Sequence, residues 1–309
     1  MPEFRSGSAE QIAYLDELLD AGLLTRTGVH GVYARGGEFE TVRLAFDRLV
    51  TRAAAPEQPE PLIFPPIIPR EQFETSGYLG SFPHLAGSVF GFDGDERDAA
   101  AQLELANRHE DWSEYQTMTD VVLTPAACYP LYPAVAKRGP LPEDGLTLDT
   151  GDAYVFRREP SSDPCRMQIF HMREIVRIAE RDTVVAWREE WRARAVELLE
   201  SLGLQIELDI ANDPFFGRTG RILASAQRQQ ELKLELLAHV TESGQTAIAS
   251  SNYHQDHFGH TYEIHTAGGE LAHTGCMAFG EERITLALLS AHGLHPAGWP
   301  AEVRERLEL

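Results

Sequence analysis

The 309-residue sequence predicts an α+β protein, in which antiparallel strands and helices occupy separate stretches of the chain. Short segments of alternating apolar and polar residues recur through the middle of the chain and are typical of half-buried strands. Amphipathic patterns of helical period lie near both ends and in residues 181–202. No internal repeat or low-complexity tract is present, so a repeat architecture is not indicated.

The first 60 residues predict a small helical extension. Residues 9–24 and 38–54 place apolar side chains on one side of a helix, and the proline-rich stretch 53–61 reads as a connector. We expect residues 1–60 to form this extension, whose role is packing, and residues 61–309 to form the main domain.

The main domain begins with extended segments. A short helix is expected around residues 69–76, and a strand at 120–124 runs into the loop TPAACYP, which carries Cys128. The segments DAYVFRREP (152–160) and RMQIFHMREIVRIAE (166–180) predict two antiparallel strands joined by a polar turn.

Periodicity and glycine positions also predict the helices and strands of residues 181–292. Residues 181–202 form a strongly amphipathic pattern that ends at Gly203. A short helix is expected in 217–230, and an apolar helix in 281–292 ends at Gly293. The expected strands are 204–212, 231–240, 246–259 (the last running into a loop) and 260–266.

Bulk composition restricts the class of partner. The formal net charge is −21, and a surface this acidic repels the phosphate backbone of tRNA or DNA. A nucleic-acid partner would need a concentrated basic module, and the sequence contains none. A nucleotide remains possible, because a few buried arginines can dominate one pocket locally.

Composition also indicates the compartment. Hydrophobic residues make up 43% of the chain, the mean hydropathy is −0.28, and no apolar run approaches the roughly 18 residues of a membrane span. The start lacks the apolar region of a secretory signal, and three cysteines, an odd number, argue against a disulfide framework. We expect a cytoplasmic protein without a membrane partner.

One set of residues suggests a nucleotide site. Arg157 and Glu159 alternate on one expected strand, while Arg166, Phe170 and Glu174 are separated by even steps on the next. Guanidinium groups bind phosphate oxygens, and a phenylalanine can stack on a purine. The alternative is a ladder of salt bridges on a solvated sheet. Arg283, near the start of the last apolar helix, would add a further anion contact.

A second set suggests a metal site. Two thiolates and a carboxylate, from Cys128, Glu174 and Cys276, could hold zinc with one position open. No spacing rule identifies this set, and buried reduced cysteines are the alternative. The rival metal set is NYHQDHFGH, with the histidines His254, His257 and His260.

A third set suggests a docking surface. Three arginines of the expected helix 217–230 fall within about 80° of one another around its axis. Such a basic stripe on an acidic chain could bind an acidic partner, and a solvated face is the alternative. The three are Arg218, Arg221 and Arg228.

In combination, these segments resemble the catalytic core of class II aminoacyl-tRNA synthetases, the seryl type in particular. PLIFPPIIPREQFETSGYLGSFPHL resembles the dimer-forming motif 1, VFRREP…RMQIFHMRE resembles motif 2, and CMAFGEERITLALL resembles motif 3. The resemblance covers about residues 60–295 and implies an antiparallel sheet flanked by helices. The long tRNA-binding arm of seryl enzymes has no counterpart in the N-terminal segment. The cysteine at position 128, where most bacterial seryl enzymes carry glutamate, matches the zinc-binding variant of atypical archaeal seryl enzymes.

The resemblance is greatest to the amino acid:carrier protein ligases. It extends to NDPFFGRTGRILASAQRQQELKLELL and SSNYHQDHFG. It implies a homodimer that activates glycine or alanine with ATP and passes it to the phosphopantetheine thiol of an acidic acyl carrier protein, docked on the 217–231 helix.

The resemblance also implies residue roles. One Zn²⁺ per subunit would be held by Cys128, Glu174 and Cys276, and Mg²⁺ would accompany ATP. The ATP contacts and catalytic groups are expected among Arg157, Glu159, Arg166, Phe170 and Arg283, and the amino-acid contacts are Cys128, Asn252 and Lys233. The chain departs from the seryl pattern at Thr246 and Ala249, where the magnesium-binding pair would stand, and at Ala278, which replaces a motif 3 glycine.

Three other functions compete with this one. A shortened seryl-tRNA synthetase would have to charge tRNA, against which the acidic charge argues. A regulatory paralogue without catalysis would be expected to lose the arginines or cysteines, which are all present. A histidine-based zinc hydrolase would use the rival metal set.

Overall fold

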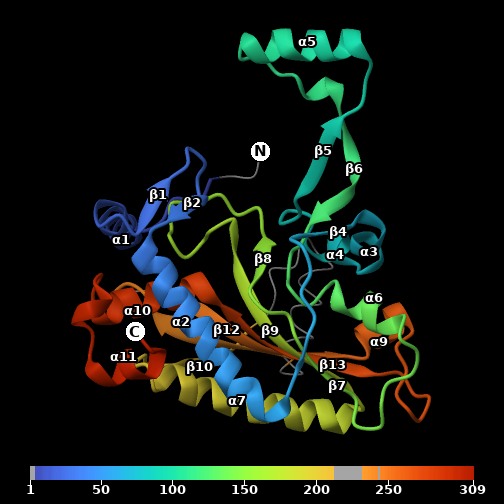
Figure 1. Ribbon diagram of the computed structural model, residues 1–309, viewed down its shortest axis with the longest axis vertical. Helices are drawn as coiled ribbons and strands as arrows, with labels where there is room; N and C mark the ends of the chain where they lie inside the picture. The colour runs from blue at the N-terminus through green and yellow to red at the C-terminus, as the bar shows by residue number, and fades with distance from the viewer. Residues whose placement is uncertain (1–3, 212–231, 243) are drawn as a thin grey trace.

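The structure is a computed structural model that describes residues 4–211, 232–242 and 244–309. Its centre is an eight-stranded sheet with the order β10-β11-β12-β13-β9-β7-β3, in which β8 also pairs with β9 (Figure 1). Paired strands are antiparallel except β3 and β7. The strands of this sheet are β3 (Glu60–Pro61), β7 (Leu146–Asp149), β8 (Ala153–Phe156), β9 (Ile169–Ala179), β10 (Glu207–Ile210), β11 (Lys233–His239), β12 (Gln245–Gln255) and β13 (His273–Gly280).

Long helices cover one face of this sheet. Ile175 on β9 and Met277 on β13 are directly opposite each other, so they share a face. They belong to one buried cluster with Trp191 of α7 (Arg181–Glu200) and Leu286 of α10 (Glu281–His292). This layer of helices leaves the opposite face of β9, β12 and β13 for other contacts.

The N-terminal helices join the same core. They are α1 (Ala9–Asp20) and α2 (Gly37–Ala54), separated by the hairpin β1 (Leu24–Arg26) and β2 (Tyr33–Arg35). Leu18 and Phe46 are fully buried members of the central cluster, and the ring of Phe46 meets that of Phe279 edge-on at 5.7 Å. The two helices expected from the sequence are present, and they share the core of the main domain. The boundary at residue 60 stays a prediction.

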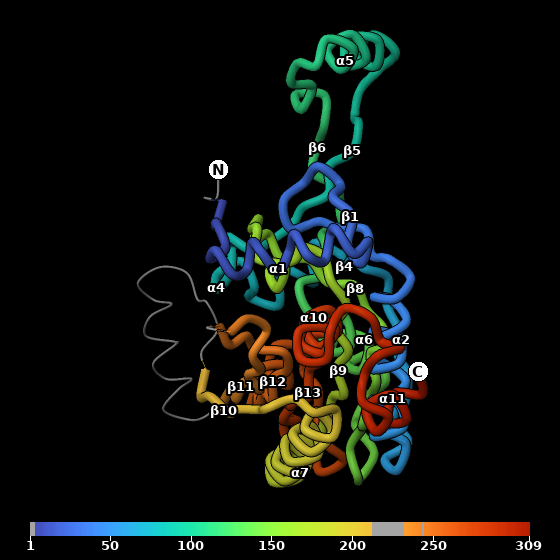
Figure 2. Tube along the Cα trace, turned by 90° about the vertical axis from the view of Figure 1, so that its left-hand side faces the viewer, coloured from blue at the N-terminus to red at the C-terminus, as the bar shows by residue number. Residues whose placement is uncertain are grey.

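A narrow arm extends away from the body. Its strands β5 (Ser88–Phe92) and β6 (Gln116–Leu123) pair in a three-stranded sheet with β4 (Ile67–Pro69), and α5 (Glu96–Asn107) lies at the tip (Figures 1 and 2). α5 has no buried residue and begins with a capping box of Asp95 and Asp98. The helix was not expected from the sequence.

Shorter helices complete the described part of the fold. They are α3 (Arg70–Thr75), α4 (Tyr78–Ser81), α6 (Leu131–Ala136), α9 (His257–Tyr262) and α11 (Ala301–Leu307). In the described ranges, no helix combines the length and the apolar character that crossing a membrane requires.

Two local predictions are wrong. Residues 260–266 were expected to form a strand, but His260 and Tyr262 end the helix α9. The buried strand β13 was missed, because burial on both faces removes the alternation that marks a half-buried strand. The expected helix 217–230 lies outside the described residues, with its three arginines.

Candidate active site

A cavity of ≈ 560 Å³ opens on the sheet face opposite α7. Its floor is formed by β9, β11, β12 and β13, and its walls by residues around α4, the loop before α6, and the start of α9. This cavity collects most of the residues that the sequence singled out.

Strand register explains why these side chains meet. Asn252 on β12 is opposite Cys276 on β13, and Ala278, two residues later, is opposite Glu174 on β9. Directly opposite residues share a face, as do alternate residues of one strand. Four residues from three strands therefore point into the same cavity.

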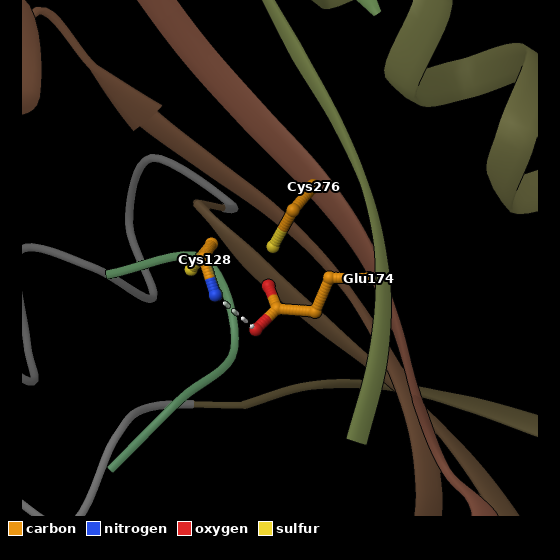
Figure 3. Close-up of side chains that lie close together, drawn as sticks. All are labelled: Cys128, Glu174 and Cys276. Atoms are coloured by element: carbon orange, nitrogen blue, oxygen red, sulfur yellow. Dashed lines mark hydrogen bonds between the residues drawn. The ribbon is translucent and has the colours of Figure 1, made fainter. Parts of the chain in front are cut away.

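Cys128, Glu174 and Cys276 form a compact group in this cavity. One potential ligand atom from each lies within 4.8 Å of the others (Figure 3). The residues are 4%, 2% and 2% exposed, in that order. Two sulfurs bound tetrahedrally to one zinc would be about 3.8 Å apart, given Zn–S bonds of about 2.3 Å. The spacing and the donor types therefore fit a zinc ion held by three protein ligands.

Backbone contacts orient the carboxylate. The Cys128 amide donates to Glu174 Oε1 at 3.1 Å (Figure 3). The Glu174 amide donates to Thr150 Oγ1 at 2.8 Å. Cys128 itself precedes α6 in a turn closed by the Leu131 amide, which donates to the Cys128 carbonyl at 3.0 Å. These contacts fix one carboxylate oxygen and leave the group directed toward the two sulfurs.

The two thiols hold their protons in the metal-free protein. The pKa of Cys276 lies well above its usual value because of its hydrogen bond with Cys128, burial and the nearby Glu174. For Cys128 the hydrogen bond with Cys276 lowers the pKa, but burial and Glu174 outweigh it and the net shift is upward. A bound cation would replace these protons, as expected for a thiolate metal site.

His254 lies beside this group, although it is not one of the three. Its Nε2 is 3.8 Å from Cys276 Sγ, and its Nδ1 is 3.0 Å from Thr274 Oγ1. The register of β12 shifts between Tyr253 and Gln255, so His254 sits at a bulge. In the described part of the chain, His254, His257 and His260 do not form a group that could hold an ion, whereas Cys128, Glu174 and Cys276 do.

Arginines line another part of the cavity. Arg157 lies with its guanidinium carbon 5.8 Å from the centre of the Phe170 ring, and its Nε donates to the Pro125 carbonyl at 3.1 Å. Arg283 donates to the carbonyls of Cys165 and Ala247 at 2.8 and 2.9 Å. Burial, followed by the charge of Arg166, lowers the pKa of Arg283. An anion bound here would be stabilised by positive charge held in a low-dielectric site.

Glu159 and Arg166 take a different place from the other predicted nucleotide contacts. They are not among the lining residues of the cavity, and they pair with each other at 3.9 Å. Arg166 precedes β9, which starts at Ile169, so the expectation that Arg166 lies on the same strand as Phe170 is wrong. Its amide closes a turn onto the Asp163 carbonyl instead.

Both expected amino-acid contacts besides Cys128 line the cavity. Asn252 donates to Cys276 Sγ at 3.3 Å and to Ser250 Oγ at 3.1 Å. Lys233 is paired with Asn252 across β11 and β12, and its ammonium is 3.2 Å from Glu235.

Aromatic residues around the metal group were missed by the sequence reasoning. The ring of Tyr132 stacks on that of Phe258 at 3.9 Å, and Tyr129 meets Phe258 edge-on at 5.7 Å. The position of His254 near Asn252 could have been predicted from the sequence, because alternate residues of a strand share a face. No comparable signal links residues 129–132 to residue 258, since α6 and α9 meet through tertiary packing.

No family model matches this chain. It is 46% identical over 306 residues to amino acid–acyl-carrier-protein ligase 1 of Bradyrhizobium diazoefficiens, covering 98% of this chain and 92% of that protein. It is 46% identical over 296 residues to ligase 2 of the same organism, covering 96% and 88%. The type-2 serine–tRNA ligase of Methanopyrus kandleri is 28% identical over 87% of this chain, which spans only 54% of that protein.

Solved structures are similar over nearly the whole chain. The M. kandleri SerRS, in a crystal structure with A. aeolicus tRNASec, superposes with a TM-score of 0.81 at 22% identity, covering 96% of this chain and 60% of that one. The seryl-tRNA synthetase of Pyrococcus horikoshii, complexed with ATP, gives 0.69 at 18% identity, covering 96% and 62%. The predicted α+β fold of the class II synthetase type is therefore confirmed.

Proposed function

The chain belongs to the family of amino acid–acyl-carrier-protein ligases, and from this premise we propose that it activates glycine or alanine with ATP and transfers it to an acyl carrier protein. The observation that carries the proposal is the single cavity that contains both the Cys128, Glu174 and Cys276 group and the arginines Arg157 and Arg283. An aminoacyl adenylate has an amino group at one end and a phosphate next to its acyl group. A site for both must offer a ligand for the amine and positive charge for the phosphate.

The metal group would serve the amine. A zinc ion held by Cys128, Glu174 and Cys276 would supply a Lewis-acidic position that accepts only an unprotonated amino group. Asn252, which reaches Cys276 Sγ, lies close enough to contact the same substrate. The aromatic wall of Tyr129 and Phe258, with His254, supports a small amino-acid side chain because these rings line the cavity beside the group.

The arginines would serve the nucleotide. In the first step the substrate carboxylate attacks the α-phosphorus of ATP, an O–P bond forms, and pyrophosphate leaves. Arg157 would neutralise charge at the α-phosphate, Phe170 would stack on the adenine, and Arg283 would hold the outer phosphates. Mg²⁺ would accompany ATP. Glu159 and Arg166, paired at the edge of this region, would read the adenine amino group and the outer phosphates after closing on ATP.

The second step would release AMP. The thiol of a phosphopantetheine group gives up its proton to solvent and attacks the acyl carbon of the adenylate, a C–S bond forms, and the C–O bond to AMP breaks. The carrier protein would dock on Arg218, Arg221 and Arg228, which lie outside the described residues.

We also propose that two copies associate. The segment 61–85 resembles the dimer-forming motif 1, and it exposes apolar side chains, with Ile63 66% and Ile67 37% exposed. Sedimentation equilibrium should give twice the chain mass of 34.4 kDa, and a monomer at micromolar concentration would contradict this part of the proposal.

The activity is tested by ATP–pyrophosphate exchange across the amino acids. We expect exchange with glycine or alanine, and then transfer of that amino acid, labelled, to a phosphopantetheinylated carrier protein but not to its form without the prosthetic group. If none of the amino acids supported ATP–pyrophosphate exchange, the proposal would be overturned. Exchange followed by transfer to tRNA alone would identify a shortened tRNA synthetase instead.

A further inference from the structure

Two arginines of the N-terminal extension reach into the core beneath the cavity. Arg43 on α2 is 3% exposed, and its Nη1 donates to Glu281 Oε2 at 2.6 Å and to Asp152 Oδ1 at 2.9 Å. Its Nε also donates to Glu40 Oε2 at 3.0 Å. One guanidinium thus joins α2 to the first residue of α10 and to the turn before β8.

Arg35 on β2 makes a parallel connection. Its Nη1 donates to Glu282 Oε1 at 2.6 Å, its Nη2 donates to Tyr154 Oη at 2.8 Å, and its Nε contacts Glu40. Glu40 therefore links the two arginines, and each arginine binds one of two consecutive carboxylates.

These carboxylates begin the helix that carries Arg283. Glu281 and Glu282 are the first two residues of α10, and Arg283 is the third. Glu282 also accepts from the His171 amide at 2.7 Å and contacts His171 Nδ1 at 2.7 Å. His171 is flanked on β9 by Phe170 and Met172, which both line the cavity.

Burial makes the arginines necessary to this arrangement. Glu281 is 0% exposed and Glu282 is 2% exposed, and one oxygen of Glu281 has no hydrogen-bond partner in the described structure. A buried carboxylate that loses its cation must take up a proton or move toward water. For Glu281, movement toward water would displace the first turn of α10 and with it the backbone of Arg283, whereas a proton taken up in place would remove the ionic link between α10 and α2.

We propose that Arg43 and Arg35 are positioning residues, through which the N-terminal extension holds the first turn of α10 and the adjoining part of β9 in the geometry that binds ATP. This inference rests on the proposed function and deepens it: it gives residues 1–60 a role in nucleotide binding in addition to packing. The arginines act through Glu281, Glu282 and His171 and do not line the cavity themselves.

The test uses Arg43→Met, which keeps most of the aliphatic volume and removes the guanidinium. In pyrophosphate exchange we expect the KM for ATP to rise roughly ten- to a hundredfold, the range expected for a small misplacement of a binding group. The KM for the amino acid and the zinc content should stay unchanged, because Cys128, Glu174 and Cys276 do not touch this network. Arg43→Lys should restore ATP binding only partly, since one ammonium cannot replace the fork that serves Glu40, Asp152 and Glu281.

Two controls separate positioning from general destabilisation. Arg52→Met removes an arginine from the same helix whose partner Glu308 is exposed, and it should leave the KM for ATP unchanged. Adding Glu281→Gln to Arg43→Met should recover part of the lost ATP binding, because no buried charge remains unpaired. If Arg43→Met fails to fold, Arg35→Met carries the same test at the more exposed end of the network.

Amide hydrogen exchange gives a readout that does not depend on activity. We expect faster amide hydrogen exchange in residues 285–287, whose hydrogen bonds to residues 281–283 close the first turn of α10, and in residues 170–172 of Arg43→Met, and unchanged amide exchange in Arg52→Met. The inference would be overturned if Arg43→Met raised the KM for ATP and the KM for the amino acid equally. Unaltered amide hydrogen exchange in these two segments would also overturn it. A different outcome is that the wild-type protein shows no pyrophosphate exchange, while Arg43→Met still shows the local change in amide hydrogen exchange. That outcome would reject the proposed function and leave the positioning role supported.

Discussion

At the scale of single residues, Glu174 shows how the candidate metal site is preorganised. Its carboxylate accepts a hydrogen bond from the Cys128 amide, and its own amide donates one to Thr150 Oγ1. The carboxylate is therefore oriented toward the two sulfurs before any ion binds. Cys276 is held equally firmly, because it lies in the middle of β13 between β9 and β12. Ligands fixed by strands and backbone contacts lose little freedom on binding a metal, which favours tight binding.

The first prediction concerns the two cysteines. Cys128→Ala and Cys276→Ala should each lower zinc affinity by more than about a hundredfold, the upper end of what outer partners of a metal contribute, because each removes a direct ligand. Amino-acid-dependent pyrophosphate exchange should be abolished. Metal analysis of the purified proteins gives the zinc content.

Cys165 provides the matched control for these variants. It is also buried, and burial raises its pKa to about 12, but it lies outside the metal group. Cys165→Ala should keep its zinc. Full exchange activity in Cys128→Ala would refute the metal role.

The second prediction concerns pH. The pKa values of Cys128 and Cys276 are raised, so both thiols carry protons at neutral pH in the metal-free protein. Zinc binding must release these protons, and zinc affinity should therefore increase as pH rises. The increase should be up to about a hundredfold per pH unit, tenfold for each proton released. Competition with a chelator between pH 6 and 8 measures the slope, and a pH-independent affinity would show that the thiols are not ligands.

At the scale of elements, the arm of β5, α5 and β6 is separate from the site. None of the residues 88–118 lines the cavity, and α5 buries no residue. Apolar side chains on the arm are nevertheless exposed, with Phe90 at 57% opposite Met118 at 37%. A two-stranded ribbon of this kind contributes little stability on its own.

The third prediction follows from this separation. Replacing residues 93–115 by a two-residue Asn-Gly turn should change the free energy of unfolding by less than about 1 kcal/mol, as for other exposed changes. Pyrophosphate exchange should be unchanged. Urea unfolding together with the exchange assay checks both, and a loss of exchange with retained stability would assign the arm a role at the site.

At the scale of the whole molecule, the net charge of −21 bears on the choice of acceptor. An acidic carrier protein and an acidic enzyme repel each other unless the contact surface is locally basic. The arginines at positions 218, 221 and 228 would provide that surface.

The fourth prediction tests these arginines. The triple change to alanine should reduce transfer to the carrier protein roughly tenfold, because exposed charge pairs contribute on the order of 0.5 kcal/mol each. Pyrophosphate exchange should be unaffected, since it needs no carrier. Raising the salt concentration should weaken transfer by the wild-type protein more than transfer by the variant. Equal transfer by the two proteins at low salt would place the carrier elsewhere.

The sequence by itself determined much of the element pattern and the chemistry of the site. The helix beginning at Arg181, the helix beginning at Glu281 and most strands have a periodicity that is visible within 10 to 20 residues. Cysteine, glutamate and arginine side chains have the same donor chemistry wherever they lie. Both kinds of information are local, and local patterns can be read without the fold.

Tertiary structure decided which of these residues meet. Cys128 and Glu174 are 46 positions apart, and their contact depends on the loop before α6 closing over β9. The central place of β13, the position of His254 beside Cys276 and the reach of Arg43 to Glu281 depend on strand register and helix packing. Strand register and helix packing are set by the burial of surfaces that are distant in sequence. A short stretch of residues therefore does not indicate which other stretch it will contact.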